Sequence, residues 1–286
     1  MITLKNQALD GQLLQASFLP LKGMNLVSLK KGDLEIIDQS TINLFEERFA
    51  GLGALIGPHF HHRENQQIPL VPFEELFPHI ARVKLKGGNE PFSHGIARYA
   101  PWNYSSTETT LHAKISGDDT WNGVLLSTLE GFNFEMYMDI ELTSQGLTIE
   151  LSVNAQRPSV CGFHYYYALE GKNNFISAKL LNRCFDGKKL YRLPESWVCN
   201  ENLHLAVEGS LDHGFYPLQA DQPTTIVLHK NSHQVEITYQ SHTEESSFQI
   251  YHPDGTSYVC IEPLSANFPR QPELNSSGVT LHIRIQ

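Results

Sequence analysis

Strict alternation of apolar and polar side chains is the feature that most constrains this fold. Every second residue is apolar from Phe132 to Glu141, and the same pattern runs from Leu147 to Asn154. Successive side chains of a β-strand point to opposite faces, so this period predicts strands with one buried and one wet face. Residues 144–146, Ser-Gln-Gly, form a turn signal between the two runs, which together predict an antiparallel hairpin.

Shorter runs with strand character recur along the chain, whereas helical signals are few. Candidate strands occupy residues 13–19, 25–29, 34–37, 96–104, 225–229, 235–239, 258–262 and 279–285. Short helical turns are expected within 41–49 and 71–80. Many short strands with few helices predict an all-β chain, a large antiparallel β-sandwich or barrel. We expect one domain over residues 1–286, because no linker, repeat or low-complexity segment divides the sequence.

Composition excludes several classes of partner. A formal net charge of −10 disfavours nucleic acid and anionic membranes, which need clustered Lys and Arg. There is no apolar signal-peptide run and no stretch long enough to span a bilayer. The four cysteines are widely spaced without a Cys-x-x-Cys motif, as expected for a reduced, cytoplasmic protein. We expect a monomer or weak homodimer.

A glutamate and a histidine stand out as candidate acid–base groups. Glu262 follows three apolar residues and precedes Pro263, which predicts a carboxylate at the end of a strand. Burial there would require a partner or raise its pKa. His164 lies in an aromatic segment, and alternation places it on one face with Gly162 and Tyr166. Aromatic rings bind the apolar faces of sugars, so this pair indicates chemistry on a neutral, ring-shaped substrate. An exposed glutamate and a core histidine are the structural alternatives.

Three further residues are candidate ligands for such a substrate. His94 precedes Gly95, where the backbone can turn sharply, and Arg98 follows four residues after His94. Asp212 lies beside a His-Gly pair, where it either forms a turn or accepts hydrogen bonds from sugar hydroxyls.

A second histidine-rich stretch offers metal-binding chemistry. Residues 59–64 read His-Phe-His-His-Arg-Glu, and imidazoles with a carboxylate suit zinc, iron or manganese. A metal-dependent β-barrel enzyme is therefore an alternative class. The main interpretation requires no metal and no cofactor.

The motifs occur in an order that resembles the aldose 1-epimerase, or galactose mutarotase-like, family. His-Gly-Ile-Ala-Arg at 94–98 is similar to the family's His-Gly-Phe-Ala-Arg element, and Cys-Ile-Glu-Pro at 260–263 to its Cys-x-Glu-Pro element. Gly-Phe-His-Tyr-Tyr-Tyr at 162–167 is similar to Gly-x-His-Pro-Tyr-Phe, although Tyr165 replaces the proline. Arg63, after the glycine-rich segment 51–53, and Asp212 resemble its sugar-binding residues.

This resemblance implies a twisted β-supersandwich that interconverts the α and β anomers of an aldose. It implies Glu262 as the base at the C1 hydroxyl and His164 as the acid at the ring oxygen. His94 would polarise the hemiacetal, while Arg63, Asp212 and Arg98 would bind the sugar.

Two other functions stay open on the same fold. The first is a hexose-6-phosphate mutarotase, whose phosphate would need cationic groups; Arg98, Arg270, Lys84 and Lys86 are the candidates. The second is a non-catalytic carbohydrate-binding protein, since a fold does not fix a function. The partner in each case is a monosaccharide or a sugar phosphate.

Overall fold

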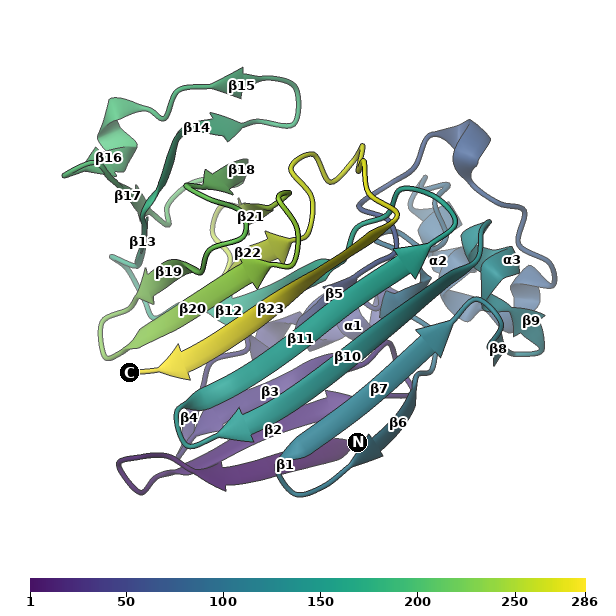
Figure 1. Cartoon of the computed structure of the whole chain (residues 1–286), viewed down its shortest axis with the longest axis horizontal. Helices are drawn as coiled ribbons and strands as arrows, with labels where there is room; N and C mark the ends of the chain where they lie inside the picture. The colour runs from purple at the N-terminus through teal and green to yellow at the C-terminus, as the bar shows by residue number, and fades with distance from the viewer.

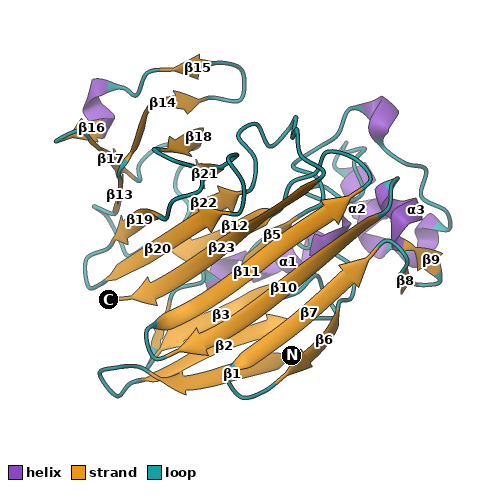
Figure 2. Ribbon diagram, viewed as in Figure 1, coloured by secondary structure: helices purple, strands orange, loops and turns teal.

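The computed structural model describes residues 1–286, and two large antiparallel sheets make up most of it (Figures 1 and 2). The prediction of an all-β sandwich with few short helices is confirmed. The eleven-stranded first sheet has the order β1-β2-β3-β5-β12-β22-β21-β18-β14-β15, with β4 paired to β3. The ten-stranded second sheet has the order β16-β17-β13-β19-β20-β23-β11-β10-β7-β6, and β8 pairs with β9 separately.

The strands have the following bounds. In the first sheet they are β1 (Ile2–Gln7), β2 (Leu13–Leu19), β3 (Asn25–Lys31), β4 (Leu34–Glu35), β5 (Gly53–Ile56), β12 (Gly162–Ala168), β14 (Leu180–Phe185), β15 (Leu190–Tyr191), β18 (Leu211–Pro217), β21 (Ser247–His252) and β22 (Tyr258–Leu264). In the second they are β6 (Asn103–Ser106), β7 (Thr110–Ser116), β10 (Phe134–Thr143), β11 (Gly146–Ala155), β13 (Phe175–Ala178), β16 (Val198–Cys199), β17 (Asn202–Ala206), β19 (Thr224–His229), β20 (Gln234–Ser241) and β23 (Ser276–Ile285). The small hairpin is β8 (Thr120–Trp121) and β9 (Val124–Leu125).

The longest predicted hairpin forms as expected. Strands β10 and β11 pair antiparallel with Met138 opposite Leu151, and their alternate apolar residues are buried while Asp139 and Glu141 are exposed. The buried faces of the two sheets meet in one apolar core of 63 residues. In β12, Phe163, Tyr165 and Tyr167 belong to that core, so the intervening side chains point away from the second sheet.

Three α-helices lie in the connections between strands. Helix α1 (Ile42–Arg48) lies within the predicted segment 41–49, and α2 (Pro78–Leu85) overlaps the predicted 71–80. Helix α2 begins at Pro78. The missing N–H of proline costs nothing there, because the first N–H groups of a helix have no partner within the helix. Helix α3 (Leu126–Glu130) was not predicted. Helices α2 and α3 lie with the β8–β9 hairpin at one end of the sandwich, on the right of Figure 1.

The expected strand over residues 96–104 is wrong. Ile96–Arg98 forms a 3₁₀ turn, and the strand β6 begins only at Asn103. Gly95 enters this turn with φ +90°, and the N–H of Ile96 is bonded to a side chain, Glu130, instead of a neighbouring strand. A long-range side-chain partner therefore overrides the local strand preference.

None of the helices has both the length and the hydropathy that a bilayer-crossing segment needs.

Gly95 lies where two backbone segments meet, and this predicts a large effect of a single methyl group. A Cβ at Gly95 would lie 1.9 Å from the carbonyl oxygen of Gly57. We expect Gly95→Ala to lower the free energy of unfolding by about 2–5 kcal/mol, combining left-handed strain with overpacking. Gly123→Ala is the matched control, because Gly123 has φ +79° with open space around it and should lose only about 1–2 kcal/mol. Equal urea midpoints for the two variants would contradict this reading.

Candidate active site

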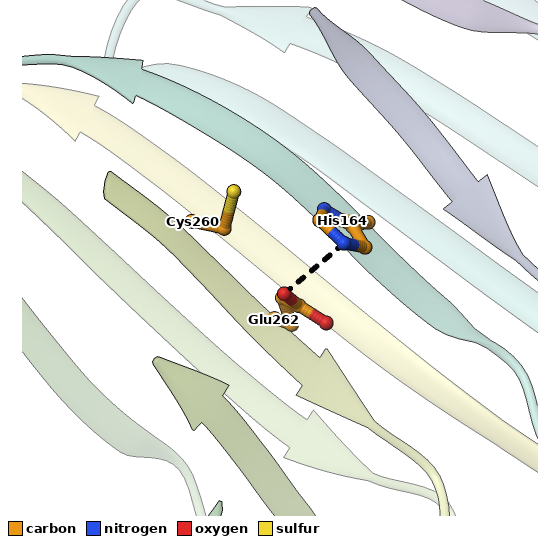
Figure 3. A group of neighbouring side chains, drawn as sticks. All are labelled: His164, Cys260 and Glu262. Carbon is orange, nitrogen blue, oxygen red and sulfur yellow. Dashed lines mark ion pairs between the residues drawn. The ribbon is translucent and has the colours of Figure 1, made fainter. Parts of the chain in front are cut away.

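The two candidate acid–base residues lie opposite each other on adjacent strands. Strands β12 and β22 pair antiparallel with Tyr165 opposite Ile261 and Tyr166 opposite Cys260, and this register brings His164 beside Glu262. Figure 3 shows both side chains on the same face of the sheet, with His164 Nε2 and Glu262 Oε1 3.3 Å apart. Residues nearly one hundred positions apart are therefore brought into direct polar contact.

Both members of the pair line a large cavity on the outer face of the first sheet. The cavity has a volume of about 930 Å³, within the range of small-molecule sites. Five of the six residues predicted for the site contribute to its wall: His94, Arg98, His164, Asp212 and Glu262. Glu262 and His164 are only 2% and 7% exposed, so little of either side chain is open to solvent.

The structural setting of Glu262 differs from the expectation in one respect. The prediction placed it at a strand terminus because Pro263 cannot donate a ladder hydrogen bond. Strand β22 instead continues through Pro263, which lies opposite Phe248, to Leu264. Strand β22 pairs with β12 on one side and β21 on the other, which holds Glu262 inside the sheet. This restricts the positions that its carboxylate can take.

Burial shifts the protonation equilibria of both residues toward their neutral forms. Desolvation raises the pKa of Glu262 well above 4.5, partly offset by the positive charge of Arg98. Desolvation likewise lowers the pKa of His164 well below 6.5, and Arg98 adds to that decrease. Both shifts favour the neutral forms, a carboxylic acid beside a neutral imidazole, over the ionised pair.

His94 stands beside His164 with one ring nitrogen already engaged. The backbone N–H of His61 donates to His94 Nδ1 at 3.2 Å. The neutral imidazole therefore carries its proton on Nε2, which makes no hydrogen bond within the protein. The His94 and His164 rings are nearly perpendicular, with centroids 5.2 Å apart. His94 thus offers the cavity an N–H donor close to the acid–base pair.

Arg98 and Asp212 reach the cavity from different elements. Arg98, in the 3₁₀ turn, donates from Nε to the carbonyl of Leu55 at 2.8 Å, while its buried Nη2 has no partner. Asp212, on β18, accepts a 2.7 Å hydrogen bond from Gln249 Nε2 on β21. Gln249 also lines the cavity and was missed in the sequence, although it alternates with buried Phe248 and Ile250.

Arg63 does not line the cavity as the resemblance implied. Its guanidinium makes a two-pronged ion pair with Glu90, from Nε and Nη2, each at 3.0 Å. Its Nη1 donates to Glu130, at 2.5 Å to the carbonyl and 3.3 Å to the carboxylate. The donors of Arg63 are thus directed toward two fully buried carboxylates that no local sequence pattern connects with it.

Exposed cations line part of the cavity, including the predicted Arg270 and one that was not predicted, Arg48. Arg48 and Arg270 line it without any ion pair or side-chain hydrogen bond, and both are exposed. Lys86 also lines it but pairs with Glu47, whereas Lys84 is directed to Glu74 and is absent from the wall. A chain that is acidic overall therefore carries free positive charge at this opening. Arg48 was not identified in the sequence because its helix carries no motif.

Two groups of residues bear on metal binding. In the predicted 59–64 stretch, His59 Nδ1 contacts Glu130 at 2.5 Å, so this histidine already has a partner. The donor atoms of His164, Cys260 and Glu262 lie within 4.8 Å of one another, a set that suits zinc (Figure 3). Burial raises the pKa of the Cys260 thiol well above 9.0, which disfavours the thiolate that a metal would need.

The raised pKa of Glu262 predicts that ionisation of this carboxyl lowers the free energy of unfolding. A raised folded-state pKa means that this group stabilises the fold below about pH 4.5 and that this contribution is lost as pH rises. Glu262→Gln cannot ionise, so it should unfold at a higher urea concentration than the wild type at pH 8, with the difference shrinking toward pH 4.5. Glu141→Gln, on the wet face of β10, is the control and should show no such trend. A pH-independent difference for Glu262→Gln would contradict the assignment.

Comparison with known proteins identifies the fold of the chain. No protein-family model matches the chain, and no curated protein matches it by sequence. Solved structures do match: a galactose mutarotase-like protein from Lactobacillus casei has a TM-score of 0.70 and 15% identity, covering 100% of both chains. The GalM/aldose epimerase homologue from C. elegans has a TM-score of 0.64 and 13% identity, covering 99% of this chain and 98% of that one.

A third match is the galactose mutarotase related enzyme from Lactobacillus acidophilus. Its TM-score is 0.61 at 14% identity, over 99% of this chain and 97% of that one. Similarity across whole chains at such low identity reports on architecture. The chain therefore has the galactose mutarotase-like fold.

Proposed function

We propose that the protein is an aldose 1-epimerase that interconverts the α and β anomers of a sugar. The observation that carries the proposal is the His164–Glu262 pair, 3.3 Å apart on the wall of the cavity. In a cyclic aldose, the C1 hydroxyl and the ring oxygen are bonded to the same carbon. An acid and a base that act on these two oxygens must lie close together, as these two groups do.

Ring opening needs one proton removed and one supplied. In the proposed reaction, proton transfer from Glu262 to His164 first gives the ionised pair; the Glu262 carboxylate then takes the proton of the C1 hydroxyl while protonated His164 donates to the ring oxygen. The C1–O5 bond breaks, and C1 becomes an aldehyde. Rotation about C1–C2 presents the other face, and the reverse transfers close the ring and restore both residues. Groups of this kind typically contribute about 10²–10⁴-fold each.

The neighbouring residues are suited to hold the sugar. The free Nε2–H of His94 would donate to the ring oxygen or a hydroxyl, and the linked pair Asp212–Gln249 would accept and donate across neighbouring hydroxyls. Holding the ring in one orientation removes part of the entropic barrier. The positive charge of Arg98 favours the ionised form of Glu262 that accepts the proton of the C1 hydroxyl.

Polarimetry on freshly dissolved α-glucose and α-galactose tests the proposal. The wild type should accelerate the approach to anomeric equilibrium, and Glu262→Gln should lose about 10²-fold or more because it cannot accept the proton. The variant should still bind sugar, whereas the control Glu141→Gln should keep the wild-type rate. A wild-type rate in Glu262→Gln would exclude it as the base. Sugar binding by the wild type without acceleration would favour the non-catalytic alternative.

A phosphorylated aldose is a second candidate substrate, favoured by the unpaired arginines at the cavity mouth. Arg48 and Arg270 have no partner in the protein, and arginine binds phosphate through two parallel hydrogen bonds. If this holds, glucose 6-phosphate should react with a lower KM than glucose, and Arg270→Met should raise the KM for the phosphate ester about 10-fold or more. Glucose kinetics should change little in that variant. Equal KM values for both substrates in the wild type would favour the free sugar.

A further inference from the structure

Four polar side chains, His59, Arg63, Glu90 and Glu130, form a cluster at the cavity wall, here called the buried charge cluster; Glu90 lines the cavity, and Arg63 is half-buried. Both carboxylates are 0% exposed. Glu90 receives the two-pronged contact from Arg63, and Glu130 contacts both Arg63 and His59. Ionised groups are costly to bury, and such clusters contribute more reliably to a defined geometry than to net stability.

The two carboxylates bind the backbone on both sides of His94. Glu130 Oε2 accepts the N–H of Ile96 at 3.0 Å, and Glu90 Oε1 accepts the N–H of Phe92 at 3.3 Å. His94 itself has φ +68°, which is unusual for a residue with a side chain. The cluster thus anchors the short segment in which His94 adopts this conformation.

The opposite side of His94 is held by the loop that carries His59 and Arg63. His94 donates its backbone N–H to the carbonyl of His61 at 3.1 Å, and its own carbonyl accepts from Gly57 at 2.8 Å. The N–H of His61 donates to His94 Nδ1, the contact that places the ring proton on Nε2. The relative position of the two loops therefore determines the tautomer and direction of the His94 ring.

We propose that the buried charge cluster is the positioning device for His94. Arg63 links the loop 57–63 to Glu90 and Glu130, and these carboxylates fix the segment 92–96. This pins the His61 N–H against His94 Nδ1 and leaves the Nε2–H directed to the cavity. Arg63 acts through His94 and does not touch the substrate. The catalytic consequence rests on the proposed function, whereas the effect on the His94 tautomer does not.

Nitrogen-15 NMR of histidine-labelled, ligand-free protein tests the positioning directly. The His94 signals, assigned by their loss in His94→Gln, should show a single Nε2–H tautomer in the wild type. Arg63→Met should give mixed tautomers or exchange broadening at His94, with circular dichroism unchanged. If Arg63→Met does not fold, the same spectra are recorded for Arg63→Lys, which keeps the positive charge but loses the two-pronged contact with Glu90. Unchanged His94 signals in the folded variant would overturn the proposal.

Steady-state kinetics separate positioning from substrate contact. Arg63→Met should lower kcat about 10-fold or more with KM within about twofold, because the misdirected His94 no longer polarises the ring oxygen while the contacts from Asp212 and Gln249 remain. A raised KM at unchanged kcat would overturn the proposal in favour of direct sugar binding by Arg63. Arg284→Met is the control, since it removes a partly exposed arginine whose ion pair with Glu236 is 3.7 Å long, and it should alter neither kcat nor the His94 signals. If the wild type has no epimerase activity, the proposed function fails, and the NMR experiment still decides the positioning claim.

Discussion

The register between β12 and β22 is the constraint on which the site depends. It places a carboxylate opposite an imidazole at 3.3 Å on neighbouring strands, both turned away from the core. A slip by one residue would turn His164 into the apolar interior and bring Phe163 or Tyr165 to the cavity. The apolar face of the same strand opposes that slip, because it would expose aromatic side chains to water. The packing of the sandwich thus also fixes the geometry of the acid–base pair.

Alternation in the sequence was sufficient to predict some of the strands and the faces of their residues, whereas strands such as β1, β5, β7 and β14 were not identified. The β10–β11 hairpin and the common face of His164 and Tyr166 follow from a period of two, which every residue of a strand obeys. Pairing of His164 with Glu262 could be expected only through the family resemblance, because no local pattern reports on partners that distant in the chain.

The structure departs from the sequence-based expectations where such distant partners act. Residues 96–104 were expected as a strand, but Glu130 takes the N–H of Ile96 and helps the chain turn. Arg63 was expected at the sugar, but Glu90 and Glu130 bind it first. These carboxylates lie 27 and 67 positions away and are unremarkable in sequence. Such long-range contacts of buried carboxylates are invisible to composition and periodicity, and they account for both differences.

Some cavity residues lie on interior strands and others on connections, and this difference determines which of them can be substituted with little disturbance. His164 and Glu262 lie on interior strands with pairing on both sides, whereas Arg270 belongs to the connection between β22 and β23, and Arg48 ends a short helix. Substitutions on the connection disturb few neighbours, whereas substitutions in the interior strands disturb two ladders at once. Directed evolution for altered substrate preference should therefore accumulate its changes along the periphery of the opening, while the reacting centre is inherited unchanged.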